Sequence, residues 1–187
     1  MKPNQEIILI TGGARSGKST YAEKIVAESP EPVVYIATAI PFDEGMKDRI
    51  KKHREQRPSH WQTIERYKDF EKLRDDPHFS KAETVLLDCL TVMITNNMID
   101  EPVDYDLCHI DEVNRIETKI KKQVTTLLDM CKNKKLVVVT NEVGMGLVPA
   151  YRLGNYFRDI SGRMNALVAQ KADEVYLVVC GIPQKIK

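Results

Sequence analysis

Short apolar runs rich in β-branched residues recur along the chain and alternate with segments of helical periodicity. This alternation favours an α/β fold in which a mainly parallel sheet is covered by helices on both faces. The predicted strands are Glu6 to Thr11, Val33 to Ala37, Thr84 to Asp88, Lys135 to Asn141 and Glu174 to Cys180.

Three segments between the predicted strands carry apolar residues at helical spacing. The segment from Ser19 to Ser29 forms a βαβ unit with the strands on either side of it, and Pro30 ends the helix. Apolar residues recur every three or four positions from about Ile110 to Cys131 and again from about Ala150 to Ala172. Asn97 to His109 is the best candidate for a long exposed loop.

Composition narrows the class of protein. A chain of 187 residues with 42% hydrophobic residues and balanced charge has the size and core of one compact domain spanning residues 1–187. A net charge of +1 gives no overall basic field, so no nucleic-acid partner is expected. No apolar run approaches the roughly 20 residues of a membrane span, so we expect a soluble, cytoplasmic protein. The four cysteines form no C-x-x-C pair, which predicts neither a zinc site nor a disulfide framework.

One motif follows the first predicted strand and opens the first predicted helix. It fits G-x-x-x-x-G-K-[ST], the phosphate-binding loop, in which glycines let successive backbone N–H groups turn toward a bound phosphate. The following helix N-terminus adds a favourable dipole, and the lysine of the motif reaches the β and γ oxygens. The motif consists of Gly12, Gly13, Ala14, Arg15, Ser16, Gly17, Lys18 and Ser19.

A phosphate-binding loop of this kind predicts a magnesium ion on the nucleotide. The hydroxyl of Ser19 is one candidate ligand, and the second ligand in such enzymes is usually an acid at the end of a neighbouring strand. Asp88 ends the predicted strand from Thr84 and supplies that acid. The alternative is that Asp88 only caps the helix that follows it.

A second group of candidate residues lies on Asp43 to Arg57, a predicted helix ended by Pro58. Arg49, His53 and Arg57 are four positions apart and therefore share one face. Two guanidinium groups beside an imidazole can hold phosphate, and their charge favours the neutral, nucleophilic imidazole. On spacing alone, a solvated basic face is the favoured interpretation, because Lys47, Lys51, Lys52 and Arg54 make the whole segment basic.

Taken together, the motifs resemble those of a known family, the bifunctional adenosylcobinamide kinase/adenosylcobinamide-phosphate guanylyltransferases of vitamin B12 biosynthesis. The resemblance covers essentially the whole chain and predicts the RecA-like three-layer fold of P-loop NTPases. It rests on the phosphate-binding loop, Tyr35 to Ala39, Arg49 to Glu65, Leu87 to Thr91, Val139 to Gly146 and Phe157 to Asn165.

The resemblance implies two reactions. The first phosphorylates the aminopropanol hydroxyl of adenosylcobinamide with ATP or GTP. The second transfers GMP from GTP to adenosylcobinamide phosphate and releases pyrophosphate. His53 matches the residue that carries the covalent guanylyl group, and Lys18 is the second expected catalytic residue.

The resemblance also implies Mg²⁺ and a homo-oligomer, with a trimer as its expected form. Beyond the loop, the implied nucleotide-binding residues are Ala37, Thr38, Ala39, Arg54, Glu55, Gln56, Arg57, Glu65 and Asp88.

The corrin-binding residues are less clear from the sequence. Ligands of open parallel sheets gather at the carboxyl ends of strands, which nominates Asn141 and the loop from Glu142 to Pro149. These residues could equally hold the loop or a subunit contact, and Arg152, Arg158 and Arg163 could meet phosphate or pair with nearby acids. Two other functions remain open: a small-molecule kinase without a covalent intermediate, and a GTP-dependent switch.

Overall fold

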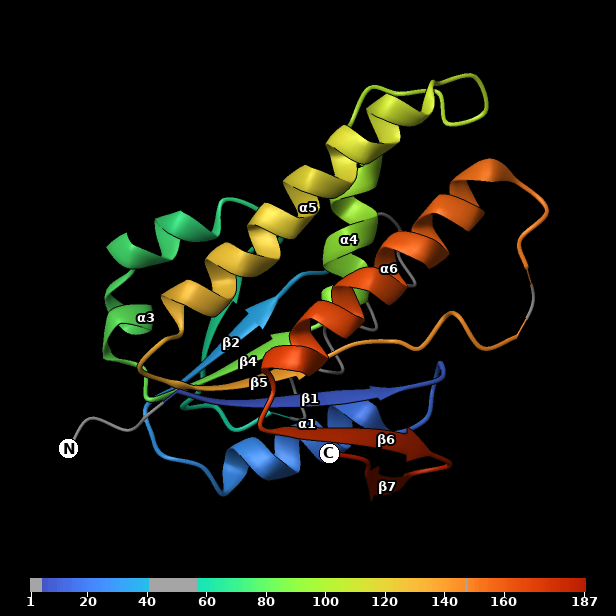
Figure 1. The fold of residues 1–187 in the computed structure, drawn as a ribbon. Helices are drawn as coiled ribbons and strands as arrows, with labels where there is room; N and C mark the ends of the chain where they lie inside the picture. The colour runs from blue at the N-terminus through green and yellow to red at the C-terminus, as the bar shows by residue number, and fades with distance from the viewer. Residues whose placement is uncertain (1–4, 41–56, 147) are drawn as a thin grey trace.

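A computed structural model describes residues 5–40, 57–146 and 148–187. Seven strands form one sheet in the order β3-β2-β4-β5-β1-β6-β7 (Figure 1), and neighbouring strands are parallel except for the pair β6 and β7. The strands are β1 (Glu6–Gly12), β2 (Val33–Ala37), β3 (Gln62–Glu65), β4 (Thr84–Asp88), β5 (Lys135–Val139), β6 (Glu174–Val179) and β7 (Ile182–Lys185).

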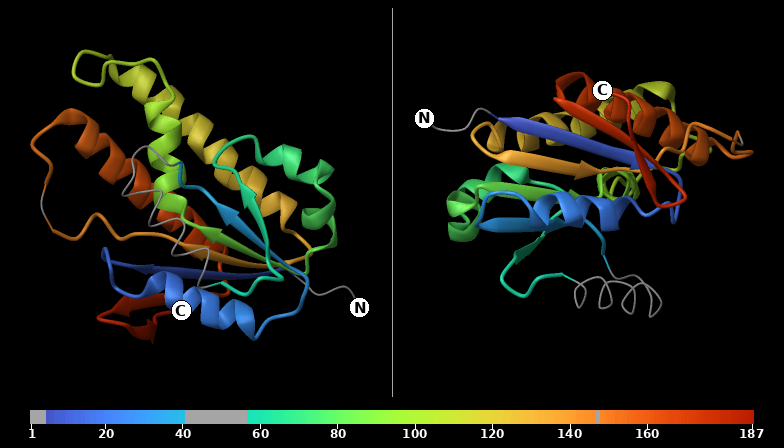
Figure 2. Two further views of the ribbon diagram at one scale, coloured as in Figure 1. Left: turned by 180° about the vertical axis from the view of Figure 1, so that it is seen from behind. Right: turned by 90° about the horizontal axis from the view of Figure 1, so that it is seen from below.

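Helices cover both faces of this sheet. In Figures 1 and 2, α4, α5 and α6 lie together on one face and α1 lies on the other. The described helices are α1 (Lys18–Ala27), a 3-10 helix η1 (Phe70–Asp75), α3 (Pro77–Lys81), α4 (Leu90–Ile99), α5 (Ile110–Met130) and α6 (Arg152–Lys171). Within the described residues, no helix is long and apolar enough to cross a bilayer.

The central strands are buried on both sides, and their alternating side chains build two separate cores. Ile7 and Leu9 of β1 belong to the larger cluster, which α4, α5 and α6 complete. Ile8 and Ile10 point to the opposite side, where they pack with residues of α1 and with Trp61. This arrangement explains why the strands appear in the sequence as continuous apolar runs rather than as alternating patterns.

The predicted α/β class, with a mainly parallel sheet between two helical layers, is confirmed. Strand β5 lies between β1, which carries the phosphate-binding motif, and β4, which ends at Asp88. That order agrees with the RecA-like arrangement expected from the family resemblance. The five predicted strands are present, and so are the helices predicted from Ser19, Ile110 and Ala150, with ends that differ by a few residues.

Several expectations from the sequence were wrong in detail. The segment Asn97 to His109 is not one exposed loop, because α4 continues to Ile99 and Tyr105 is buried, donating its hydroxyl to the carbonyl of Met98 (2.7 Å). Two strands at the sheet edges, β3 and β7, were not predicted, and β7 is antiparallel.

Candidate functional site

The phosphate-binding motif joins the end of β1 to the start of α1. Gly17 caps α1 with a left-handed backbone (φ 93°), a conformation that glycine adopts at little cost. The backbone N–H of Tyr21 donates to the carbonyl of Gly17 (3.0 Å), and the Nζ of Lys18 donates to the carbonyl of Gly13 (2.6 Å). The lysine ammonium group therefore lies against the loop, at the positive end of the helix dipole.

The turn between β6 and β7 packs against this loop. The N–H of Gly181 donates to the carbonyl of Ser16 (2.8 Å). A Cβ atom added to Gly12 would lie 2.3 Å from the carbonyl oxygen of Val178, and one added to Gly17 would lie 3.1 Å from the Cα of Gly181. The glycines of the motif thus allow close packing of the loop against β6 as well as approach to phosphate.

The register of the sheet aligns several predicted site residues in one row. Ala37 of β2 pairs with Glu65 of β3 on one side and with Asp88 of β4 on the other. Asp88 in turn pairs with Val139, whose other neighbour is Ile10. Because the strands are parallel, this row is the carboxyl edge of the sheet, where ligands of such folds bind.

Asp88 is the last residue of β4 and does not cap α4. The N-cap is Cys89, whose Sγ accepts from the N–H of Val92 (3.4 Å), so the alternative of Asp88 as a helix cap is wrong. Burial, followed by the negative charge of Asp88, raises the pKa of the Cys89 thiol to about 12. Cys89 is therefore a protonated thiol near neutral pH, not a nucleophile.

The carboxylate of Asp88 accepts a hydrogen bond at Oδ2 from the hydroxyl of Tyr35 (3.0 Å). Tyr35 is 4% exposed, and the guanidinium carbon of Arg57 lies 3.6 Å from the centre of its ring. Burial, followed by the charge of Asp88, raises the pKa of the Tyr35 phenol, so Tyr35 stays protonated and acts as a donor. The three side chains place an anion and a cation around one aromatic ring.

Glu23 of α1 belongs to the same neighbourhood. It lies one helical turn after Ser19, on the same face of α1. Burial, followed by the charge of Asp88, raises the pKa of Glu23, whereas the charge of Arg57 lowers it. Within the described part of the chain, Oε1 of Glu23 is buried and makes no hydrogen bond. Glu23 and Asp88 are therefore two carboxyl groups close enough to interact beside the phosphate-binding loop.

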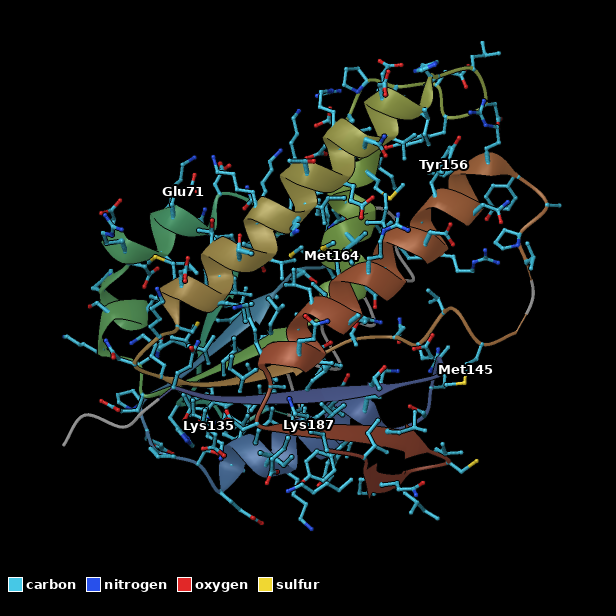
Figure 3. All side chains as sticks on the ribbon, in the orientation of Figure 1. Glu71, Lys135, Met145, Tyr156, Met164 and Lys187 are labelled. Carbon is cyan, nitrogen blue, oxygen red and sulfur yellow. The ribbon has the colours of Figure 1, made fainter. Side chains whose placement is uncertain are left out.

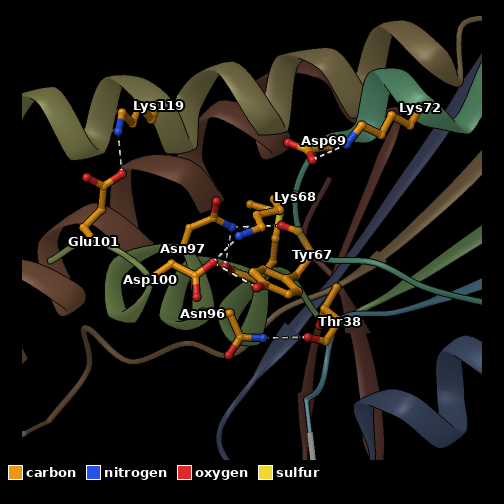
Figure 4. Close-up of polar contacts among 11 residues, drawn as sticks. Thr38, Tyr67, Lys68, Asp69, Lys72, Asn96, Asn97, Asp100, Glu101 and Lys119 are labelled. Carbon is orange, nitrogen blue, oxygen red and sulfur yellow. Dashed lines mark hydrogen bonds and ion pairs between the residues drawn. The ribbon is translucent and has the colours of Figure 1, made fainter.

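Thr38 lies beneath this edge rather than at its surface. It is 1% exposed, and its Oγ1 donates to the carbonyl of Cys89 and accepts from the N–H of the same residue (both 2.8 Å). Its carbonyl accepts from Nδ2 of Asn96 on α4 (2.7 Å), as Figure 4 shows. Thr38 thus links the ends of β2 and β4 to α4. Its neighbours Ala37 and Ala39 are partly exposed.

A closed set of hydrogen bonds holds the end of β5. The N–H of Asn141 donates to Oγ1 of Thr91 (2.6 Å), which lies 3.1 Å from Oγ1 of Thr140. Thr140 donates to Oδ1 of Asn165 (2.7 Å), and Nδ2 of Asn165 donates back to the carbonyl of Asn141 (3.1 Å). The backbone of Asn141 therefore holds the start of its loop, which is one of the two roles considered for this residue.

The remaining predicted site residues are distributed as follows. Glu65 is exposed at the end of β3, and Gly13, Ala14 and Arg15 are exposed at the tip of the phosphate-binding loop. Ser19 is partly exposed. The helix predicted over Asp43 to Arg57 lies outside the described residues except for Arg57, and so do His53, Arg54, Glu55 and Gln56.

The arginines of α6 are engaged with the protein. Arg158 pairs with Asp159 (3.1 Å), and Arg163 pairs with Glu117 of α5 through two contacts (2.6 and 2.9 Å). Arg152 donates to the hydroxyl of Tyr156 and to the carbonyls of Asp106 and Cys108, in the loop between α4 and α5. In this structure the side chains of these three arginines therefore bond to other groups of the protein.

The loop after β5 exposes three large apolar side chains: Met145 is 74% exposed, Val148 71% and Tyr151 62%. Figure 3 places Met145 near the carboxyl edge of the sheet. Glu142, at the start of this loop, accepts at Oε1 from the N–H of Gly144 (2.7 Å). An exposed apolar loop at this edge suits contact with a large ligand or with another subunit.

A cavity of about 630 Å³ lies elsewhere, between α4, α5 and the segment after β3. No residue of the predicted nucleotide site lines it. Its charged groups pair with one another: Lys68 with Asp100 (2.6 Å) and Lys119 with Glu101 (2.6 Å), as Figure 4 shows. This cavity is therefore not the candidate site.

Reasoning from the sequence did not single out Tyr35, Glu23 or Gly181 as part of the site. A tyrosine in an otherwise aliphatic buried strand is one signal that was available, because a buried hydroxyl needs a partner. The spacing of Glu23 from Ser19 by one helical turn is a second. The contact of Gly181 with the phosphate-binding loop depends on tertiary packing, so no local sequence pattern predicts it.

Comparison with known proteins gives consistent matches. The model of the family described as cobinamide kinase / cobinamide phosphate guanyltransferase matches residues 8–186. The chain is 45% identical over 183 residues to the "Bifunctional adenosylcobalamin biosynthesis protein CobU" of Escherichia coli, covering 97% of this chain and 99% of that protein. It is 42% identical to the protein of the same name from Salmonella typhimurium, with the same coverage.

A solved structure of the protein PH0250 from Pyrococcus horikoshii matches with a TM-score of 0.50 at 12% identity, covering 97% of this chain and 86% of that one. At this identity the likeness concerns the fold alone. The family model and the two curated relatives span nearly the whole chain, including the phosphate-binding loop and Asp88. The chain therefore belongs to the cobinamide kinase / cobinamide phosphate guanyltransferase family and is a bifunctional transferase of adenosylcobalamin biosynthesis.

Proposed function

We propose that one nucleotide site, formed by the phosphate-binding loop and Asp88, serves both reactions. In the first, adenosylcobinamide is phosphorylated with ATP or GTP. In the second, GMP passes from GTP to adenosylcobinamide phosphate through a guanylyl group on His53. The observation that carries this proposal is the convergence of Lys18, Asp88 and Arg57 at one edge of the sheet, beside a helix N-terminus.

The kinase step requires stabilisation of negative charge and needs no covalent intermediate with the enzyme. The substrate hydroxyl attacks the γ-phosphorus, the bond to the β-γ bridging oxygen breaks, and the hydroxyl proton leaves to solvent or to a nearby base. Lys18 and the loop N–H groups stabilise the negative charge on the transferring group. In the structure Lys18 already lies against the loop, through its bond to Gly13.

The guanylyl step divides one substitution into two. A neutral imidazole nitrogen of His53 attacks the α-phosphorus, forming a P–N bond while the bond to pyrophosphate breaks. A phosphate oxygen of adenosylcobinamide phosphate then attacks the same phosphorus, and the imidazole leaves. Arg57 is one turn from His53 in the predicted helix, and its guanidinium near Asp88 supplies positive charge for the phosphates of the nucleotide.

Mg²⁺ fits the oxygen donors of this site. The hydroxyl of Ser19 and the carboxylate of Asp88 are the hard ligands that magnesium prefers alongside nucleotide phosphates. Burial and then the charge of Asp88 raise the pKa of Glu23, and the same Asp88 charge favours a cation here. When bound, the metal would neutralise charge on the phosphates in both reactions.

The covalent intermediate is tested by incubating the protein with GTP labelled at the α-phosphate. We expect one labelled group per chain that is stable in alkali and labile in acid, as a phosphoramidate is. His53→Ala should abolish this label and leave much of the kinase activity. His60→Ala is a matched control, because His60 is an exposed histidine whose ring pairs with Glu31.

The outcomes also separate the alternative functions. Formation of adenosylcobinamide phosphate without any labelled protein would favour a kinase that makes no covalent intermediate. Binding of GTP without formation of either corrin product would favour a nucleotide-dependent switch. Full labelling of His53→Ala would show that another residue carries the nucleotide. Running the kinase reaction with ATP and with GTP determines which donor is preferred.

We further propose that adenosylcobinamide approaches the loop from Asn141 to Pro149 and that the enzyme is a homo-oligomer, with a trimer as the expected form. The exposed Met145, Val148 and Tyr151 support this placement, since they offer apolar surface at the carboxyl edge of the sheet. We expect the enzyme to act in the cytoplasm, where both nucleotides are available. Native mass spectrometry measures the assembly directly.

A further inference from the structure

Tyr35 contacts two of the residues assigned to the nucleotide site, although it has no place in the reactions themselves. Its hydroxyl donates to Oδ2 of Asp88 (3.0 Å), and its ring lies under the guanidinium of Arg57 (3.6 Å from ring centre to guanidinium carbon). It is 4% exposed and is held within β2, between β3 and β4. One rigid side chain therefore fixes an acidic and a basic residue relative to each other.

We propose that Tyr35 is a positioning residue that orients the Asp88 carboxylate toward the metal-nucleotide complex and holds Arg57 beside it. This inference rests on the proposed function, because it takes Asp88 as a metal ligand and Arg57 as a phosphate contact.

The hydroxyl of Tyr35 restricts the rotation of the carboxylate. A carboxylate has two oxygens with about four acceptor positions, so a bond at Oδ2 leaves capacity for a cation at Oδ1. Partners that orient a metal ligand in this way commonly contribute 10- to 100-fold to metal affinity. Loss of the hydroxyl would leave the carboxylate in place at the end of β4 but free to rotate.

The ring makes a separate contribution. A guanidinium group over an aromatic face is attracted by the ring, and more strongly when the pair is shielded from water. The guanidinium carbon of Arg57 lies 3.6 Å from the centre of the Tyr35 ring, and this contact holds Arg57 beside the residue that also bonds Asp88. The two contributions can be removed one at a time, because phenylalanine keeps the ring and leucine does not.

The experiment uses the full-length protein with Mn²⁺ in place of Mg²⁺ and a non-hydrolysable GTP analogue. The dissociation constant of Mn²⁺ is obtained from the electron paramagnetic resonance signal of the free ion. The nucleotide affinity is measured separately in EDTA. The variants are Tyr35→Phe and Tyr35→Leu. Tyr105→Phe is the matched control, because it also removes a buried tyrosine hydroxyl bond, to the carbonyl of Met98 on the far helical layer.

We expect Tyr35→Phe to raise the Mn²⁺ dissociation constant about tenfold and to leave the metal-free nucleotide affinity within about twofold of wild type. Tyr35→Leu should in addition weaken metal-free nucleotide binding several-fold, because Arg57 loses its ring. Tyr105→Phe should change neither constant, although it should lower the melting temperature about as much as Tyr35→Phe does.

Two results would overturn the inference while leaving the proposed function intact. One is wild-type Mn²⁺ affinity in Tyr35→Phe. The other is an equal loss of affinity in Tyr105→Phe, which would mean that any loosening of the fold has the same effect. If the wild-type protein binds nucleotide but no Mn²⁺, the assignment of Asp88 to the metal fails, and the role of Tyr35 fails with it.

Discussion

The backbone N–H of Gly181 donates to the carbonyl of Ser16 at 2.8 Å, which joins the turn between β6 and β7 to the phosphate-binding loop. The two residues are far apart in sequence, and they meet because β6 pairs with β1 up to Gly12. The turn has left-handed backbone at Cys180 (φ 51°) and Gly181 (φ 80°). The shape of the loop therefore depends on the conformation of this turn.

Replacing Gly181 with alanine tests that dependence. Apart from Gly181 and its chain neighbours, no atom of the described residues lies within 4 Å of the added Cβ, so the cost is the left-handed backbone conformation, about 1 kcal/mol. We expect Gly181→Ala to weaken GTP binding several-fold and to lower the melting temperature by a few degrees. Gly162→Ala on the exposed face of α6 is the control, and it should be neutral or slightly stabilising. Equal nucleotide affinity in the two variants would argue against a role of the turn in shaping the loop.

The thiol of Cys180 gives a chemical test of the same turn. Cys180 is exposed, whereas burial raises the pKa of Cys131 to about 12, and Cys89 has a similarly raised pKa. We expect a maleimide at neutral pH to label Cys180 first, and the adduct to weaken GTP binding. Peptide mapping identifies the labelled residue, and Cys180→Ser should resist the effect while binding GTP normally. Labelling that occurs first at Cys108 would contradict this expectation.

The sequence predicted the central strands well because both of their faces are buried, which requires continuous apolar runs such as Ile7 to Ile10. It failed at the edges for the same physical reason. Gln62–Glu65 and Ile182–Lys185 are only partly buried, so their composition is mixed and their strand conformation comes from pairing with β2 and β6. Tyr105 was misjudged because its burial depends on packing between loop and helix.

The site followed a similar division. The phosphate-binding loop is a local motif and could be located from spacing alone, together with the acid at the end of a buried strand. The bond between Tyr35 and Asp88 joins residues 53 positions apart, and it depends on the register of β2 with β4. The sequence alone does not show which residues of β2 and β4 are paired, so the contact between Tyr35 and Asp88 could not be predicted from it.

Thr140→Val tests the closed set of hydrogen bonds at the end of β5. The valine keeps the shape of the side chain but leaves Oδ1 of Asn165 and the hydroxyl of Thr91 without a partner from this residue. We expect a loss of about 1–3 kcal/mol in the free energy of unfolding, measured in urea. Thr118→Val on the exposed face of α5 removes only a local bond to Asn114 and should cost far less. Similar losses in both variants would show that the network adds no stability of its own.

A pH-dependent contribution to stability is expected from Glu101. Its hydrogen bond with Lys119, and then that with Arg115, lowers its pKa below the ordinary value of 4.5. The folded protein thus favours the charged carboxylate, so this stabilisation is present above about pH 4.5 and is lost as the pH falls through the folded-state pKa. The cations are half exposed, which limits the effect at neutral pH to about 0.5–1 kcal/mol.

The corresponding variant is Glu101→Gln. We expect its melting temperature to lie about 1–3 °C below wild type at pH 7, with the difference shrinking below pH 4.5. Glu71→Gln is the control, because Glu71 is exposed and makes no ion pair with another described residue. A difference that stays constant from pH 7 to pH 3 would show that the ion pairs do not contribute.

The position of β5 between β1 and β4 has a consequence for how this enzyme tolerates sequence change. Ile10, just before the phosphate-binding loop, lies two strand spacings from Asp88, about 10 Å, and backbone hydrogen bonds set this separation. Side chains on either face of β5 can vary in size without altering that separation, provided the ladder is kept. Substitutions in the two cores should therefore reduce the amount of folded enzyme before they reduce the turnover of each folded molecule.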